Sequence, residues 1–180
     1  DNVAPNIYID TLGYYETSLP NGLVNVSYPL FIAKGFDSLD GKVEVNYKVY
    51  KNYQTIDQEE VQVDNNSFIP NEAGTYTIVY FASDKAGNYF SKNISIEVKD
   101  TLEKLNYVLK DNLPKNTFVG KYLTLPQGML LGGSGNITLK IEVKDPNNNI
   151  QELNLKNKTI FFEKKGTYQI IFTLTDFLQN

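Results

Sequence analysis

Oxygen-bearing side chains around position 84 have the types and spacing that could hold an ion. Asp84, Asn88 and Asp100 supply carboxylate and amide oxygens, the ligands that calcium prefers. Asp and Asn are also typical of turns, where their side chains accept hydrogen bonds from nearby backbone amides. No Asp-x-Asp-x-Asp loop accompanies them. We therefore expect Asp84 and Asn88 to build a turn between two strands and no cofactor to bind, with calcium near a domain junction as the alternative.

Catalytic chemistry is disfavoured by composition. The 180 residues include no His and no Cys, which removes the usual general base, the usual triad centre and any disulfide. Glu59 and Glu60 are adjacent, so on a strand they would point to opposite faces and could not act as an acid–base pair. The glycine-rich segment 132–135 lacks a following Lys-Ser or Lys-Thr, which predicts a flexible loop and not a phosphate cradle. We expect no enzymatic activity.

Binding partners are constrained by charge and hydropathy. The net charge is −4, and no basic block collects on one segment, so we expect no nucleic-acid partner. No apolar run reaches about eighteen residues, so direct membrane insertion is not expected. Tyrosines on predicted loops or polar faces could stack on sugars or anchor a protein, although scattered exposed tyrosines are normal. These are Tyr14, Tyr15, Tyr50, Tyr53 and Tyr89.

One pattern occurs twice and predicts the domain organisation. The run that begins Gly74-Thr75-Tyr76 returns as Gly166-Thr167-Tyr168, 92 positions later. Further upstream, Tyr28 aligns with Tyr122 at an offset of 94. A repeat of this length corresponds to one small β domain. The repeat therefore predicts two tandem domains, residues 1–99 and 100–180.

Alternation of apolar and polar residues predicts that the elements are strands. Residues 43–49 and 137–143 each alternate strictly, which is typical of a strand with one buried and one solvated face. After Asn88 the first copy continues into an alternating segment, residues 89–99, whereas the second copy stops at Asn180. We expect the second domain to lack its last strand and to have an open sheet edge. Either the chain is part of a longer protein, or a neighbouring segment supplies the strand.

The repeated Gly-Thr-Tyr segment fits the tyrosine corner of immunoglobulin folds. In that corner a Tyr near the start of a strand lies two residues before the second Cys of the domain. Tyr76 and Ile78 take these two positions in the first copy, with Gly74 permitting the tight turn before them. The second copy supplies Gly166, Tyr168 and Ile170. The hydroxyl is predicted to bond back to the backbone of the turn, and the ring to cover the core.

Together these segments resemble the Ig-like repeats of large secreted or surface-anchored bacterial proteins. The resemblance rests on five motifs along nearly the whole chain: Ala4-Pro5-Asn6-Ile7, Asp40-Gly41-Lys42-Val43, Phe68-Ile69-Pro70, the Gly-Thr-Tyr segments, and Ala82 to Asn88. It implies an all-β chain of two tandem immunoglobulin-like β-sandwiches. It also implies a non-catalytic, extracellular module that spaces or presents neighbouring domains of the same polypeptide, or contributes to adhesion at the cell wall. The alternative is a carbohydrate-binding accessory module of a secreted glycan-degrading enzyme, and the protein or glycan partner is unassigned.

Overall fold

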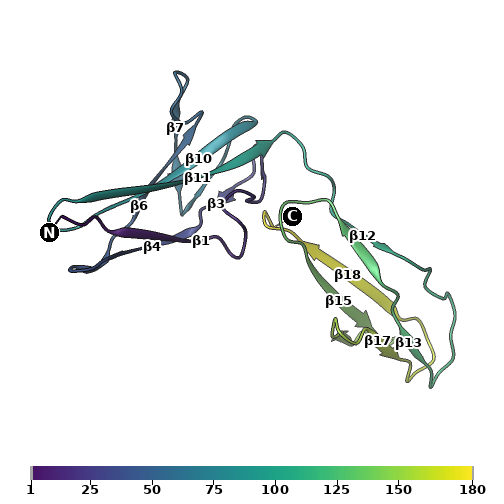
Figure 1. The fold of residues 1–180 in the computed structure, drawn as a ribbon. Helices are drawn as coiled ribbons and strands as arrows, with labels where there is room; N and C mark the ends of the chain where they lie inside the picture. The colour runs from purple at the N-terminus through teal and green to yellow at the C-terminus, as the bar shows by residue number, and fades with distance from the viewer. Residues whose placement is uncertain (1, 180) are drawn as a thin grey trace. The chain divides into compact units, whose positions relative to one another are not determined.

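The structure is a computed structural model that describes residues 2–179, and the chain divides into two compact units. Unit 1 covers Asp1–Leu102 and unit 2 covers Glu103–Asn180. The boundary predicted from the sequence, after residue 99, lies three residues before the boundary in the structure. All regular structure in the described residues is β-strand (Figure 1). Within that part of the chain there is accordingly no apolar helix of membrane-spanning length.

Both units consist of short strands and one or two long ones, and nearly all neighbouring strands are antiparallel. The strands of unit 1 are β1 (Asn6–Asp10), β2 (Gly22–Leu23), β3 (Tyr28–Pro29), β4 (Ile32–Asp37), β5 (Gly41–Val43), β6 (Asn46–Lys51), β7 (Glu59–Val61), β8 (Val63–Asp64), β9 (Ser67–Phe68), β10 (Gly74–Ser83) and β11 (Tyr89–Lys99). Those of unit 2 are β12 (Asn106–Leu109), β13 (Tyr122–Thr124), β14 (Gly128–Leu131), β15 (Thr138–Lys144), β16 (Ile150–Glu152), β17 (Thr159–Phe161) and β18 (Gln169–Thr175).

Unit 1 places two sheets face to face. The larger has the order β2-β11-β10-β6-β7, and the smaller has the order β1-β4-β5 (Figure 1). Strand β2 runs parallel to β11, whereas the other neighbours are antiparallel. A further small sheet, β3-β9-β8, completes the unit. The arrangement is consistent with a β-sandwich.

The core of unit 1 is unusually rich in tyrosine. Tyr28, Tyr76 and Tyr80 are at most 1% exposed, and the hydroxyls of Tyr28 and Tyr80 donate to backbone carbonyls at 2.9 and 2.8 Å. Burial raises the pKa of both of these phenols far above the usual range. Phe68 stacks on Tyr76, with ring centroids 5.5 Å apart. Each buried tyrosine can thus contribute apolar area without leaving its hydroxyl unsatisfied.

Unit 2 repeats part of this architecture. Its largest sheet has the order β16-β15-β18, matching β7-β6-β10 of unit 1. The register also matches, because Ile170 pairs with Val143 as Ile78 pairs with Val49. A smaller core of buried apolar side chains supports it: Leu125, Ile141, Val143, Leu153, Ile160 and Phe162. No described strand of unit 2 occupies the place of β11.

The structure corrects one part of the repeat alignment. Leu123 pairs with Ile160 where Tyr28 pairs with Phe68, so Tyr28 corresponds to Leu123 and not to Tyr122. Tyr28 is buried, whereas Tyr122 is 71% exposed. The predicted offset of 94 is therefore wrong by one residue in this segment. Shared aromatic identity produced the error, since Tyr122 points to solvent.

A second expectation, of one continuous strand over residues 43–49, is also wrong. The chain forms β5, which pairs with β4, and then crosses to β6 in the other sheet. Gly35 allows the crossing, because a Cβ there would lie 2.6–2.9 Å from atoms of Val43 and Val45. Alternation persists through the crossing, so the sequence pattern alone does not reveal it.

Candidate functional site

Asp84 and Asn88 form a turn, and Asp100 lies far from them. The Asp84 carboxylate accepts the Asn88 backbone N–H at 2.8 Å and its side-chain amide at 2.7 Å. Ser83 pairs with Tyr89 at one end of the β10–β11 ladder, and Asp100 follows the other end. Ten residue pairs of about 3.3 Å rise separate the ends. The three candidate calcium ligands therefore cannot share one ion, and no acidic group of three suited to a metal occurs among the described residues.

A second Asp-x-x-x-Asn turn, which the sequence reading missed, lies in unit 2. Asp145 accepts the backbone N–H and the side-chain amide of Asn149 at 2.9 and 3.0 Å, and the backbone N–H of Asn147 at 2.8 Å. These hydrogen bonds, that of the Asn149 side chain first, lower the pKa of Asp145 to about 2. The spacing of four residues between Asp and Asn, shared with Asp84 and Asn88, was the signal that could have found it.

The glycine-rich loop is anchored and not free. Ser134 is buried, and its backbone N–H donates to the Asp176 carboxylate at 2.8 Å. Its carbonyl accepts the Phe177 N–H at 2.9 Å. Gly132 adopts φ +74°, and a Cβ there would lie 2.2 Å from the Lys104 carbonyl oxygen. The glycines therefore permit close backbone packing at the entry to β15, which corrects the expectation of a flexible loop.

The two predicted tyrosine corners differ in detail. In unit 1 the Tyr76 hydroxyl donates to the Glu72 carbonyl at 3.0 Å, and Ile78 is completely buried. In unit 2 the Tyr168 hydroxyl accepts the Lys164 N–H at 3.1 Å, and Ile170 is only half-buried. Gly74 and Gly166 precede them with φ +139° and +143°. All six residues lie at corresponding positions of the two units, the four Tyr and Ile side chains in packing contacts and the two glycines at positive φ.

An ion pair accompanies each corner, with its charges exchanged. Lys51, on β6, binds Glu72, which precedes β10. The hydrogen bond that the Lys51 ammonium donates to the Glu72 carboxylate raises the pKa of Lys51. At the corresponding positions of unit 2, Asp145 accepts from Lys164 at 3.4 Å. A cation and an anion thus connect the same two elements in both units.

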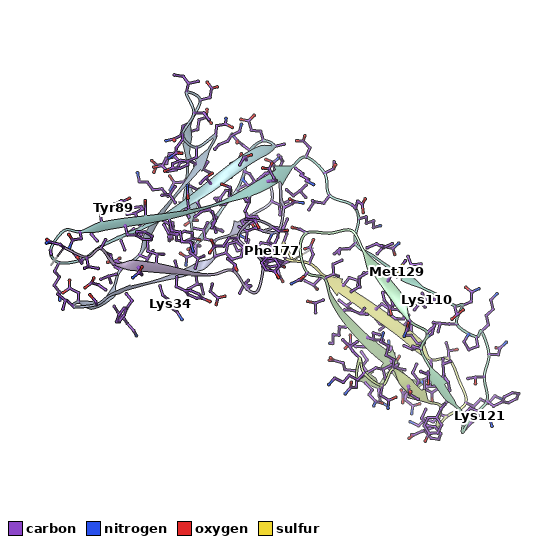
Figure 2. The ribbon with its side chains drawn as sticks, viewed as in Figure 1. Lys34, Tyr89, Lys110, Lys121, Met129 and Phe177 are labelled. Atoms are coloured by element: carbon purple, nitrogen blue, oxygen red, sulfur yellow. The ribbon has the colours of Figure 1, made fainter. Side chains whose placement is uncertain are left out.

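The best candidate for a binding surface is the solvated side of the β1-β4-β5 sheet. Tyr8, Ile32 and Phe36 are 66%, 68% and 59% exposed there. Phe36 pairs with Lys42, and Tyr8 pairs with Lys34, which points to the outer side of the sheet in Figure 2. Directly opposed side chains on a sheet lie about 5 Å apart and diagonal ones about 7–8 Å apart. We call these five residues the outer face of unit 1; it combines two aromatic rings with two ammonium groups.

Unit 2 has an apolar but non-aromatic counterpart. Val108 pairs with Met129, and Asn106 pairs with Leu131, on the exposed side of β12 and β14. Figure 2 labels Met129 and also Lys110, which follows β12. These pairs occupy the positions of Tyr8 with Lys34 and of Asn6 with Phe36. At these corresponding positions of the described residues, exposed aromatic rings therefore occur in unit 1 and not in unit 2.

None of the five tyrosines considered from the sequence belongs to the outer face. Tyr15 and Tyr89 are well exposed, Tyr14 is half-buried, and Tyr50 and Tyr53 pack on each other with centroids 5.4 Å apart. Tyr8 was missed, although its position between the apolar residues Ile7 and Ile9 already placed it on the polar side of a strand.

An isopeptide crosslink between Asn93 and Lys42 or Lys48, conceivable in a β domain without Cys, gains no geometric support. Lys48 and Asn93 both pair with Val79, from opposite sides of β10, so two strand spacings of about 4.8 Å separate them. Lys48 instead forms an ion pair with Glu60 at 3.0 Å. Lys42 belongs to the other sheet.

Comparison with known proteins adds no further assignment. The sequence matches no protein-family model, and no curated protein matches it.

Proposed function

We propose that the chain is a non-catalytic Ig-like module of a larger extracellular bacterial protein. Its role is to space or present neighbouring domains of the same polypeptide at the cell surface, or to contribute to adhesion. The observation that supports this most is the repetition of one strand arrangement, β16-β15-β18 and β7-β6-β10, with matching register. A unit used twice suits a function that depends on the number of units. The sequence resemblance to bacterial surface repeats supplies the setting.

Surface display tests the presenting role. The chain is placed between a bacterial cell-wall anchor and an epitope tag, and antibody labelling of intact cells is compared with that of a tag joined directly to the anchor. We expect stronger labelling with the chain present, without any turnover in a broad hydrolase screen of the purified chain. Equal labelling would contradict the presenting role, and reproducible turnover would contradict the non-catalytic assignment.

A carbohydrate-binding role is the second candidate, and the outer face of unit 1 favours it. Tyr8 and Phe36 expose their rings on one side of one sheet, beside Lys34 and Lys42. Exposed aromatic rings offer rigid apolar area to the flat faces of sugars. This role predicts binding through unit 1, because the corresponding positions in unit 2 are Val108 and Leu131.

Retention on insoluble glycans tests this second role. The purified chain is compared with the double variant Tyr8→Ser/Phe36→Ser and with Tyr89→Ser, a control that removes an exposed aromatic ring from β11. A carbohydrate-binding module would be retained, and only the double variant would lose retention. No retention on any glycan, or equal loss in the control, would exclude the outer face as a sugar site.

A further inference from the structure

A polar pocket of unit 2 opens between β16 and β17. It has a volume of about 200 Å³. Side chains from the segment 149–153 form one wall, side chains from the segment 159–164 form the other, and Asp145 and Tyr168 also line it. We call it the β16–β17 pocket. Pockets for drug-sized ligands have about 300–1,000 Å³, so this one has room for a single small ring.

Gln151 places an amide at a position where the core side of the sheet calls for an apolar residue. It pairs with Val143, a buried residue, so the two side chains are on the same face of the sheet. At the corresponding position of unit 1, Val61 pairs with Val49. The Gln151 side chain forms no hydrogen bond with another described residue. Its carbonyl oxygen and its NH₂ group are therefore free to bind a polar molecule in the pocket.

Asp145 holds two further polar groups of the pocket in place. Its carboxylate accepts the side-chain amide of Asn149 at 3.0 Å and the ammonium of Lys164 at 3.4 Å. Both partners line the pocket, as does the carboxylate of Glu163. The side-chain oxygen of Asn149 remains an acceptor for a further donor. Groups that are already fixed in this way lose less conformational entropy when a ligand binds.

An exposed pair of aromatic rings lies at the rim of the pocket. Tyr122 and Phe161 are paired across β13 and β17, with ring centroids 4.7 Å apart, and they are 71% and 42% exposed. Phe161 also lines the pocket. The residue of unit 1 at the position of Phe161 is Ile69, which follows Phe68 as Phe161 follows Ile160. An aromatic ring beside the pocket is thus a feature of unit 2 at this position.

The charges of the pocket disfavour an anionic ligand. Its lining includes two carboxylates, of Asp145 and Glu163, and one ammonium, of Lys164, which already pairs with Asp145. An uncharged sugar matches the remaining groups. Its flat apolar face fits an exposed aromatic ring. Its hydroxyl groups both donate and accept, as the amides and the Glu163 carboxylate require.

We propose that the β16–β17 pocket binds the terminal ring of an uncharged glycan chain. The ring stacks on Phe161, its hydroxyls bond to Asn149, Gln151 and Glu163, and Tyr122 extends the aromatic surface toward the next sugar. This inference is independent of the presenting role and of the outer face of unit 1, since it concerns another surface. An insoluble glycan offers few chain ends, so this pocket is not expected to cause retention on such a material.

Titration of the full chain with soluble disaccharides tests the proposal. Cellobiose, maltose, lactose and diacetylchitobiose are each added to isotope-labelled protein and followed by amide NMR. We expect at least one of them to shift signals of residues 143–153 and 159–168, and digalacturonic acid, which is anionic, to shift none of these. Absence of shifts with all four sugars at millimolar concentration would overturn the proposal, as would equal binding of digalacturonic acid.

Two variants that introduce the residues of unit 1 assign the binding to the pocket. Gln151→Val is expected to weaken binding about two- to tenfold, the range for one lost hydrogen bond. Phe161→Ile is expected to weaken it by a similar factor, because an aliphatic side chain cannot stack on the sugar. Both replacements suit a strand, and the dispersion of the amide signals shows whether unit 2 remains folded.

Two control variants leave the pocket intact. Phe118→Ile removes an aromatic ring of unit 2 that is 79% exposed and does not line the pocket. The double variant Tyr8→Ser/Phe36→Ser removes the rings of the outer face of unit 1. We expect both to bind the sugar as the parent chain does. Loss of binding in either control, or unchanged binding in both pocket variants, would overturn the assignment.

Discussion

Tyr76 and Tyr168 stand at corresponding positions, yet their hydroxyl groups have opposite roles in a hydrogen bond. The Tyr76 ring is fully buried and its hydroxyl donates to the Glu72 carbonyl. The Tyr168 ring is half-buried and its hydroxyl accepts the exposed Lys164 N–H. An exposed amide can exchange such a partner for water at small cost, whereas a bond at a buried side chain has no such replacement.

Removing the two hydroxyls should therefore have unequal effects. Tyr76→Phe is expected to lower the free energy of unfolding of unit 1 by about 0.5–1.5 kcal/mol. Tyr168→Phe is expected to lower that of unit 2 by less. Urea titration followed by resolved NMR signals of each unit measures both changes. A larger loss from Tyr168→Phe would contradict the assigned hydrogen-bond roles.

One ion pair lies close to Tyr76 and another close to Tyr168. Lys51 with Glu72 and Asp145 with Lys164 connect the same elements with opposite polarity. The Asp145 carboxylate additionally closes its turn by accepting the Asn147 and Asn149 amides. In unit 2 the Asp145 carboxylate therefore closes the turn and also forms the ion pair. Because protonation of this carboxylate removes both, the stability of unit 2 depends on pH.

Acid should weaken unit 2 partly through Asp145. Its pKa is lowered from 3.8 to about 2 in the folded chain. A lowered pKa stabilises the folded state above the unfolded value, and this contribution is lost as the pH falls through about 2. The melting temperature of unit 2 should therefore fall less between pH 5 and about pH 2 in the Asp145→Asn variant than in the parent chain. This pH window follows from the lowered pKa of Asp145. Thermal melting at several pH values measures it, and parallel pH profiles would contradict the assignment.

Strands β10 and β18 differ in the number of their neighbours. With β6 and β11 on its two sides, β10 buries Ile78 completely. With β15 on one side, β18 leaves Ile170 half-buried. The same residue type at corresponding positions is thus exposed to different extents because of one neighbouring strand.

Truncation of these two isoleucines should report that difference. Ile78→Ala is expected to destabilise unit 1 by about 2–5 kcal/mol, since it opens a cavity in a closed core. Ile170→Ala is expected to destabilise unit 2 by about 1–2 kcal/mol, because less apolar area is lost. Denaturant unfolding of each variant gives both values. Equal losses would show that β18 is covered as fully as β10.

Alternation predicted most strands but not the sheets to which they belong. Ile94, Ile96 and Val98 alternate with polar residues and are buried as expected. Residues 43–49 alternate equally well, yet they cross between sheets near Gly35. A period of two specifies the face of each residue and carries no information on its neighbouring strand.

The candidate surfaces were less predictable than the strands. The turn of Asp84 and Asn88 was predicted, whereas that of Asp145 and Asn149 was not, because Asp145 lies outside the repeated Gly-Thr-Tyr segments. Tyr8 was predicted to lie in a strand, but the exposure of its ring was not predicted. The pocket lined by residues 113–119 and by Ile170 of β18 was not predicted, since residues 113–119 form no strand.

At the scale of the whole molecule, the two units differ in the size of their cores. Of the buried aliphatic and aromatic side chains among the described residues, fourteen lie in unit 1 and seven in unit 2. Apolar burial is the main favourable term in folding. Unit 2 is therefore expected to be the less stable part of the chain.

Denaturation should proceed in two steps. Urea is expected to unfold unit 2 first and unit 1 at a higher concentration, because the free energy of unfolding increases with buried apolar area. Circular dichroism shows the two transitions, and NMR signals assign each to its unit. A single transition with coincident loss of both sets of signals would contradict independent cores.

Amide hydrogen exchange along β10 and β18 is the most direct test of the relation between the two units. It tests whether the same strand arrangement occurs in both units and whether β18 has an unpaired edge in the described chain. A strand with two neighbours binds all of its amides, whereas an edge strand binds every second one. The structure predicts uninterrupted protection through residues 76–81, and alternating fast and slow exchange through residues 169–175. Uninterrupted protection of β18 in the monomeric chain, or no protection in β18 at all, would contradict this account.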